Sequence, residues 1–475
     1  MKIAMNANRT WDELAVGDEA STRRVCAAND LYVFAHASGN LNPMHLPGRD
    51  EDHDGRDDAV APSMWVGALV SAVLGNLLPG PGTLYRGQTF RFLSRVHVGD
   101  ELTIRVRVKE KRAKPCVVLD TSVSLADGTL VADGVAEVDA PVVKLTFPPH
   151  EIPELLVERH QQFDRMIAMC RDLEPVPTAV VAPEDKNSLG GAILGFEAGL
   201  CVPILIGAKA RILDCARQLG ADISRLEIVD IEDEHEAAAR GVAMVHEGRA
   251  RAVMKGAIHS DELLEHVVKK DGGLRVGRRI SHVFVMDCPG VPHPLIISDA
   301  AINIAPDLET KVSIVQNAID VALSLGMEKP RVGILSAVET VNPAMPSTLD
   351  AAVLSKMAER GQIKGGVVDG PLAMDNAIDM EAARTKGITS LVAGRAQVLI
   401  APNIESANML AKELTFLAHA EGAGLVVGAR VPVIMTSRAD NDKSRLASCA
   451  LALLYDYWRR EGRPHALLAT KAAAE

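Results

Sequence analysis

Aromatic residues are scarce in this sequence, at only 3% of its 475 residues. The hydrophobic cores must therefore be built mainly from Ala, Val, Leu and Ile. No apolar run approaches the roughly 18–20 residues that cross a bilayer. The first residues, MKIAMNANRTWDEL, lack the apolar centre of a signal peptide. We therefore expect a cytoplasmic protein with no membrane partner.

The cysteines lack any regular spacing. The seven lie at positions 26, 116, 170, 201, 215, 288 and 449, with no CxxC pair or zinc-like pattern. A scattered, odd set of thiols indicates reduced cysteines in a reducing compartment, and no metal site.

Positively charged residues are fewer than negatively charged ones. A formal net charge of -11 argues against nucleic acid as a partner, although a local basic pocket can still hold an anionic small ligand.

The pattern of the sequence changes near residue 140, and the length favours two or three domains. Before that point, residues 101–108 and 116–125 alternate as half-buried strands do. Residues 61–78 form one apolar segment, which a Pro-Gly pair closes, and they predict a buried helix. This pattern indicates an α+β domain in which the sheet wraps around the helix.

A proline-rich segment, PVVKLTFPPHEIP at 141–153, reads as a linker. We expect an N-terminal domain over 1–140, a linker over 141–158 and a C-terminal domain over 159–475. In the C-terminal domain, strand-like runs alternate with helix-like runs. This alternation predicts an α/β domain with a mostly parallel sheet and helices on both faces. We expect the functional loops at the carboxyl edge of that sheet. The strand-like runs are 201–207, 282–286, 331–335 and 397–401, and the helix-like runs are 208–219, 308–325 and 406–420.

Asn40 and His45 form the sharpest local signal of the N-terminal domain. They flank an Asn-Pro turn, which could aim the amide and the imidazole into one pocket. The alternative is structural: the asparagines make Asx-turns and His45 caps a helix.

The stretch around these residues resembles the MaoC-like (R)-specific enoyl-CoA hydratases of the hot-dog fold, over roughly residues 8–140. The resemblance includes LPGPGTLYRGQTFRF at 78–92 and VHVGDELTIRVRV at 96–108. In that family the pattern D-x-N-P-x-H activates the water that adds to an enoyl thioester. His45 matches the histidine, but Asn40 stands where the aspartate is expected.

An amide cannot take a proton from water. The resemblance therefore leaves two alternatives: a slow or altered hydratase with His45 as a lone base, or a fold kept for acyl-CoA binding or dimerisation. We favour the second. Backbone N–H groups at the helix start near Ser63 could still bind a thioester oxygen.

Three polar motifs stand out in the C-terminal domain. Lys255 and Ser260, in MKGAIHS, could form an anion cradle at a strand end. Asp369 and Asp375 surround a Gly-Pro turn, where turn capping and helix initiation are the structural alternative. The segment SRADND at 437–442 follows an apolar run and combines a hydroxyl, a guanidinium and two carboxylates, which suits acid-base chemistry and anion binding.

Residues 160–470 resemble the phosphate acetyl/butyryltransferases, which share the architecture of isocitrate and isopropylmalate dehydrogenases. The detail looks closer to the butyryltransferase branch. The matching stretches are PILIG at 203–207, SDAAINIAPDLETK at 298–311, LSAVETVNPAMPSTLDA at 335–351, VDGPLAMDNAI at 368–378, APNIESANMLAKEL at 401–414 and PVIMTSRAD at 432–440.

This resemblance implies roles for the SRADND segment. Ser437 would position the coenzyme A (CoA) thiol, Arg438 would bind phosphate or the oxyanion, and Asp440 or Asp442 would be the base. Two departures leave alternatives open. Acetyl-type enzymes place the base where this chain has Ser444, and they carry a phosphate-binding arginine roughly where it has His266. Arg275 or Lys255 is the expected substitute.

We therefore expect an enzyme that transfers a short acyl group between CoA and inorganic phosphate. Its substrates would be a CoA thioester and phosphate, with no bound cofactor, and it would be a homo-oligomer, a dimer or larger. The alternatives are a fully bifunctional hydratase and acyltransferase, or a non-catalytic acyl-CoA-binding scaffold. A metal- and NAD-dependent dehydrogenase is disfavoured, because the paired aspartates of a magnesium site on one helix turn are missing.

Overall fold

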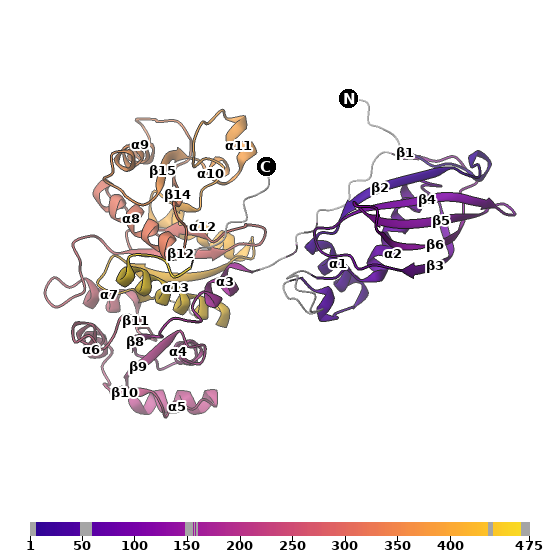
Figure 1. The fold of residues 1–475 in the computed structure, drawn as a ribbon. Helices are drawn as coiled ribbons and strands as arrows, with labels where there is room; N and C mark the ends of the chain where they lie inside the picture. The colour runs from indigo at the N-terminus through magenta and orange to yellow at the C-terminus, as the bar shows by residue number, and fades with distance from the viewer. Residues whose placement is uncertain are drawn as a thin grey trace. The chain divides into compact units, whose positions relative to one another are not determined.

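The computed structural model describes residues 6–47, 59–147, 155, 157, 160–435 and 440–466. The chain divides into two compact units, Met1–Val157 and Glu158–Glu475. Each unit has its own large sheet and its own hydrophobic core (Figure 1).

Five antiparallel strands form the main sheet of the N-terminal unit, in the order β2-β4-β5-β6-β3. Their bounds are β2 Glu19–Val25, β3 Leu84–Phe92, β4 Glu101–Lys111, β5 Cys116–Leu125 and β6 Leu130–Asp139. Buried residues alternate with more exposed ones along β4, because successive side chains of a strand point to opposite faces. The two strands predicted from alternation, at 101–108 and 116–125, are confirmed as β4 and β5.

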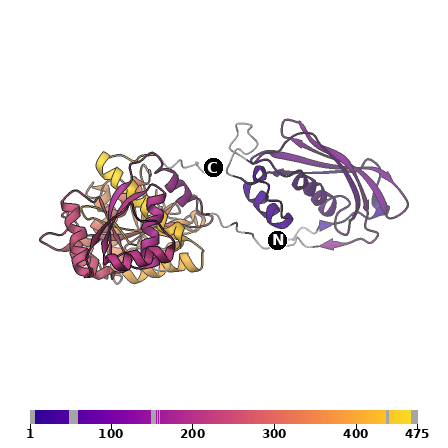
Figure 2. The ribbon, with the colours of Figure 1, turned by 90° about the horizontal axis from the view of Figure 1, so that it is seen from below.

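Helix α2, Ser63–Asn76, packs on this sheet and confirms the buried helix predicted over 61–78. Figure 2 shows α2 lying against the concave side of the curved sheet. Val70 and Leu74 of α2 are buried with Leu102 and Ile104 of β4 in one core. The unit is therefore an α+β hot-dog domain. Its other helices are η1 Trp11–Glu13, α1 Ala28–Ser38 and η2 Pro43–His45.

Part of the expected linker packs on the N-terminal unit. Strand β7, Thr146–Phe147, pairs with β1, Asn6–Ala7. The amide of Asn8 donates hydrogen bonds to the carbonyl oxygens of Pro81 and Val143, each at 3.0 Å. The chain up to residue 147 is thus held to this unit by backbone pairing and by a buried asparagine.

Eleven of the described strands form the sheet of the C-terminal unit, in the order β10-β9-β8-β11-β18-β17-β12-β13-β16-β14-β15. Figure 1 shows this order running from β15 at the top to β10 at the bottom. The bounds are β8 Val176–Val181, β9 Cys201–Gly207, β10 Glu227–Asp230, β11 Ala252–Lys255, β12 Ser281–Asp287, β13 Leu295–Ser298, β14 Arg331–Leu335, β15 Val367–Leu372, β16 Val398–Ile400, β17 Glu421–Val427 and β18 Val433–Ile434. The predicted strand-like runs correspond to β9, β12, β14 and β16.

Helices cover both faces of this sheet, as the sequence predicts. Within β8, Val180 joins one core while Ala179 and Val181 join another, because neighbouring residues of a strand face opposite sides. The helices are α3 Gln162–Ala168, α4 Lys186–Glu197, α5 Lys209–Leu219, α6 Glu234–His246, α7 Ser260–Val268, α8 Leu308–Ser324, α9 Pro346–Glu359, α10 Met374–Ile378, α11 Met380–Thr385, α12 Ile404–Phe416 and α13 Asp442–Glu461. The core on the Val180 side takes residues from α3, α4, α5, α8, α9 and α13, whereas α6 and α7 lie on the other side.

The expectation of a single carboxyl edge is wrong, because the middle of the sheet is antiparallel. Strand β17 runs antiparallel to both of its neighbours, β18 and β12, and β12 runs antiparallel to β13. Five parallel strands at one side of the sheet, β10, β9, β8, β11 and β18, therefore end at one edge, which we call the β18 edge. The strands β13, β16, β14 and β15 end at the opposite edge, the β15 edge.

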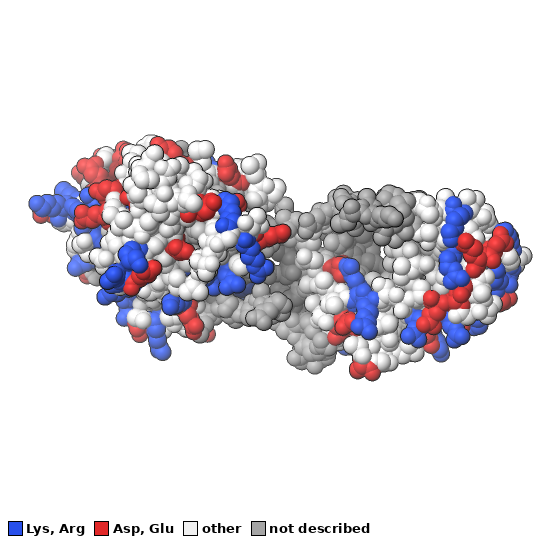
Figure 3. Space-filling view, turned by 90° about the horizontal axis from the view of Figure 1, so that it is seen from above, with Lys and Arg blue, Asp and Glu red and all other residues white. Residues whose placement is uncertain are grey.

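Charged side chains are interleaved on the side of the molecule that Figure 3 shows, with basic and acidic residues close together on each unit. On the N-terminal sheet, cross-strand ion pairs such as Lys109–Asp120, at 3.0 Å, also bring the two charges together. None of the described helices is both long and apolar enough to cross a membrane.

Separate cores predict separate effects on stability. Replacing Leu74 with Ala removes a side chain that is 1% exposed, so the N-terminal unit should lose about 2–5 kcal/mol of unfolding free energy. Chemical denaturation with urea measures this loss. Met64→Ala on the same helix is the control, because Met64 is 61% exposed. A C-terminal transition that shifts as far as the N-terminal one would contradict the independence of the two cores.

Candidate active site

Lys255 and Gly256 lie at the β18 edge of the C-terminal sheet. Lys255 is the last residue of β11 and is paired in register with Val181, the last residue of β8. Gly256 packs so closely that an added Cβ would lie 2.3 Å from the backbone oxygens of Val181 and Ala182. Ala182 itself adopts a positive φ of 50°, which is uncommon for a residue with a side chain. The chain is thus tightly constrained where the lysine leaves the sheet.

Ser260 follows on the same edge as the first residue of α7. The backbone N–H of His259, the N-cap, donates to the carboxylate of Glu262 at 3.4 Å. The short loop from β11 to α7 therefore brings Lys255 and Ser260 to the same edge of the sheet. His266, in the last turn of α7, lies near His235, with ring centres 5.9 Å apart and the ring planes tilted by 54°.

Ser437 and Arg438 lie outside the described residues. The chain is described again from Asp440, which is half-buried. Asp442 is exposed at the start of α13, whereas Ser444 is only 5% exposed in the same turn. Because β18 pairs directly with β11, Met254 lies beside Ile434, and the two motifs start from adjacent strands.

Glu421 and Asp287 add two carboxylates to this edge that the sequence analysis missed. They face each other in register where β17 begins and β12 ends. One carboxylate oxygen of Glu421 accepts a hydrogen bond at 3.1 Å from the amide of Asn441, the N-cap of α13. The other is buried with no hydrogen-bond partner. Burial raises the pKa of Asp287, which accepts the backbone N–H of Phe163 at 3.1 Å.

These two residues could be found only through the fold. Neither stands in a motif with other polar residues, and antiparallel pairing of strands more than 130 positions apart brings them together.

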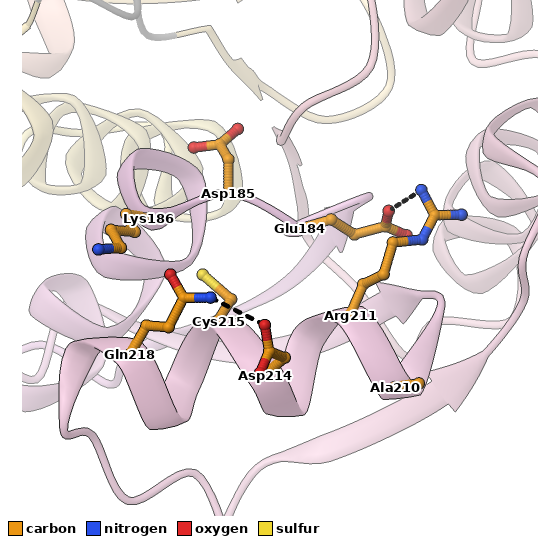
Figure 4. Close-up of a pocket in the computed structure, with 8 residues that line it drawn as sticks. All are labelled: Glu184, Asp185, Lys186, Ala210, Arg211, Asp214, Cys215 and Gln218. Atoms are coloured by element: carbon orange, nitrogen blue, oxygen red, sulfur yellow. Dashed lines mark hydrogen bonds and ion pairs between the residues drawn. The ribbon is translucent and has the colours of Figure 1, made fainter.

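A pocket of about 500 Å³ opens beside the ends of β8 and β9, between α4 and α5 (Figure 4). Glu184 lines this pocket. Its carboxylate accepts the backbone N–H of Ala208 at 2.7 Å and pairs with Arg211 at 2.7 Å. Figure 4 shows that Lys186 of α4 and Cys215 of α5 also line the pocket. Burial raises the pKa of the Cys215 thiol, so this cysteine is a poor nucleophile.

Asp369 and Asp375 belong to the β15 edge, not to the edge with Lys255. Asp369 accepts the N–H of Gly370 at 2.9 Å and the hydroxyl of Ser390. Asp375 accepts the N–H of Asn376 at 2.8 Å, which lowers its pKa, and it pairs with Lys386 at 3.5 Å. Both carboxylates therefore have the local partners that turn capping and helix initiation require.

Arg275 is exposed and does not lie beside Lys255. It forms an antiparallel bridge with Ala429, which follows the end of β17 and so belongs to the opposite edge from Lys255. Arg275 and Lys255, which the sequence analysis offers as alternatives for phosphate binding, therefore lie at opposite edges of the sheet.

His45 of the N-terminal unit has a defined tautomer. Its Nδ1 lies 2.7 Å from the carbonyl oxygen of Val60, which can only accept, so in the neutral ring the proton is on Nδ1 and the lone pair on Nε2. The side-chain oxygen of Asn40 accepts the N–H of Asn42 at 3.2 Å, which is the Asx-turn of the structural alternative. Ser63 is exposed at the start of α2. Among the described residues, no group of three or more His, Cys, Asp or Glu side chains could hold a metal ion.

Family models match both halves of the chain. A model described as phosphate acetyl/butaryl transferase matches residues 234–453, and one described as a MaoC like domain matches residues 14–126. A phosphate acetyltransferase of Rhizobium meliloti is 58% identical over 299 residues, which cover 63% of this chain and 95% of that protein. A phosphate butyryltransferase of Clostridium beijerinckii is 42% identical over 294 residues, covering 62% and 97%.

A branched-chain phosphotransacylase from Enterococcus faecalis V583 is similar in structure. It has a TM-score of 0.52 and 29% identity, and the match covers 59% of this chain and 99% of that one. The chain therefore belongs to the phosphate acetyl/butyryltransferase family. It is an enzyme of that family which also carries a MaoC-like domain. The expected closeness to the butyryltransferase branch is not borne out, because the acetyltransferase of R. meliloti has the higher identity.

Gly256 offers a test of the β18 edge. Gly256→Ala should lower the acyl transfer rate by at least roughly 10-fold, because its Cβ cannot fit against two backbone oxygens and must displace Lys255. Steady-state kinetics on purified protein measures this. Gly190→Ala is the matched control, since a Cβ there meets nothing within 4 Å. Equal activity of both variants would show that Lys255 needs no fixed position.

Proposed function

We propose that the C-terminal unit transfers a short acyl group from CoA to inorganic phosphate, giving acyl phosphate and free CoA, and catalyses the reverse reaction. Membership of the phosphate acetyl/butyryltransferase family carries this proposal. The convergence of the β11 end, the β18 end and the start of α13 at one sheet edge supports it.

The chemistry requires a base, an anion ligand and a thiol position. A phosphate oxygen attacks the thioester carbonyl, the C–O bond forms, the C–S bond breaks, and the CoA thiolate leaves. In the reverse direction a base must remove the thiol proton, because at a pKa of about 8.5 few thiols ionise at neutral pH. We assign the thiol position to Ser437, the anion ligand to Arg438 and the base to Asp440 or Asp442.

Release of free CoA thiol tests the proposal. Thiol release from acetyl-, propionyl- and butyryl-CoA should depend on phosphate, and comparison of the three shows which chain is preferred. Arg438→Ala should reduce kcat by roughly 10²–10³-fold, which is the usual loss for one oxyanion donor. Arg384→Ala, an exposed arginine of α11, is the control. Release that ignores phosphate, or that survives Arg438→Ala, contradicts the assignment.

Slow hydration of an enoyl-CoA is a second candidate function, for the N-terminal unit. The tautomer of His45 favours it, since Nε2 is left free to accept a proton from water. Without that reaction, the domain would serve acyl-CoA binding or dimerisation. Both units would then handle the same class of substrate, a CoA thioester.

Substitution of Asn40 distinguishes hydration from a binding role. Asn40→Asp should raise hydration of crotonyl-CoA by roughly 10²-fold or more, because a carboxylate can act as the base while still accepting the N–H of Asn42. Loss of absorbance of the enoyl thioester measures the rate. His45→Ala should abolish the gain, and Asn42→Asp, at an exposed neighbouring position, should not reproduce it. No gain with Asn40→Asp would leave the unit a binding domain.

A further inference from the structure

Arg445 is a buried cation without a counter-ion among the described residues. Only two of the described Lys and Arg residues are buried, Lys311 and Arg445, each 6% exposed. Lys311 pairs with Asp350 at 2.6 Å. Arg445 forms no ion pair with any described carboxylate, and its hydrogen bonds go to Asn187 alone. A buried charge without a partner is costly, so this arginine requires an explanation.

The guanidinium has unused donors. One terminal nitrogen, Nη1, donates to the backbone oxygen of Asn187 at 3.0 Å and approaches its side-chain oxygen at 3.4 Å. No hydrogen bond to another described group engages Nε or Nη2 of Arg445. A guanidinium has five N–H donors in a planar fork that suits two oxygens of a phosphate group.

The position of Arg445 places these donors at the β18 edge. Arg445 lies in the first turn of α13, and helical side chains lean toward the N-terminus, where the helix dipole favours an anion. Asn187 lies in the first turn of α4, which begins five residues after Val181, and Val181 is in register with Lys255. The N-terminal amides of α4 are already capped by Asp185, so the arginine is the main donor.

The packing of α4 holds the arginine in place. A Cβ added to Gly191 would lie 3.2 Å from Cδ of Arg445, so the absence of a side chain at Gly191 makes room for the arginine stem. The neighbouring Gly190 has nothing within 4 Å of such an atom.

We infer that Arg445 binds a phosphate group of a substrate at the β18 edge. This inference rests on the proposed acyl transfer between CoA and phosphate, and it assigns the phosphate-binding role that the sequence analysis sought in Arg275 or Lys255. Two sources share this chemistry, inorganic phosphate and a phosphate of CoA.

Kinetics of the full chain with Arg445→Gln, Arg445→Lys and Gly191→Ala distinguish the sources. For inorganic phosphate, we expect Arg445→Gln to raise KM for phosphate by roughly 10–100-fold, with KM for acyl-CoA unchanged. If the group belongs to CoA, KM for acyl-CoA rises instead, and KM for its dephospho form does not. Arg445→Lys should give a smaller rise, because lysine lacks the fork.

The matched controls are Gly190→Ala and Arg459→Gln. Arg459 is on the same helix and also donates to backbone oxygens, those of Ala429 and Arg430, but at the other end of α13. Both controls should leave every KM within about twofold, as expected for sites away from the charge.

A binding readout keeps the test independent of catalysis. Inorganic phosphate, or CoA compared with dephospho-CoA, should raise the melting temperature of the wild-type chain, and Arg445→Gln should lose this rise. If the chain transfers acyl groups but Arg445→Lys and Gly191→Ala change no KM, and no anion stabilises the chain through Arg445, the inference is overturned while the proposed function stands. If the chain transfers nothing yet phosphate still stabilises it through Arg445, the proposed function fails and the anion site remains.

Discussion

The packing of α13 across the middle of the C-terminal sheet is the constraint on which the candidate active site depends. From Ser444 to Asp456 almost every residue of this helix is buried, and it contacts α3, α4, α8 and β17. Small residues make the close approach possible: a Cβ on Gly195 of α4 would lie 3.0 Å from the sulfur of Cys449. Because the helix is held along most of its length, its first turn has a fixed place at the β18 edge.

Polar side chains are bonded differently at the two edges of the C-terminal sheet. Where β11 and β18 end, one carboxylate oxygen of Glu421 has no hydrogen-bond partner, and Arg445 forms no ion pair with a described carboxylate. At the β15 edge, Asp369 and Asp375 are bonded to neighbouring backbone and side chains. Unsatisfied buried polar groups are rare in folded proteins, so the unbonded oxygen of Glu421 distinguishes this edge from the bonded carboxylates Asp369 and Asp375.

Two polar side chains of the N-terminal unit, His45 and Asn40, also differ in the partners that they contact. Nδ1 of His45 lies within hydrogen-bond distance of the carbonyl oxygen of Val60, whereas the side chain of Asn40 accepts the N–H of Asn42 in an Asx-turn. The sequence analysis predicted the helix and the strands, and it singled out both residues, because these signals are local. It could not predict the tautomer, since Val60 lies fifteen positions away and beyond a turn.

The sequence by itself determined the two-part organisation, the elements of each sheet and the motifs around Lys255, Asp369 and Ser437, because alternation, helix periodicity and short motifs are properties of neighbouring residues. Only the tertiary structure decided which motifs share an edge. The antiparallel strands β17 and β12 reverse the direction of half the sheet, which separates Asp375 from Lys255 and brings Glu421 to Asp287. It also decided that Arg445 is buried and that no described carboxylate pairs with it, because burial and pairing depend on contacts between residues far apart in the chain.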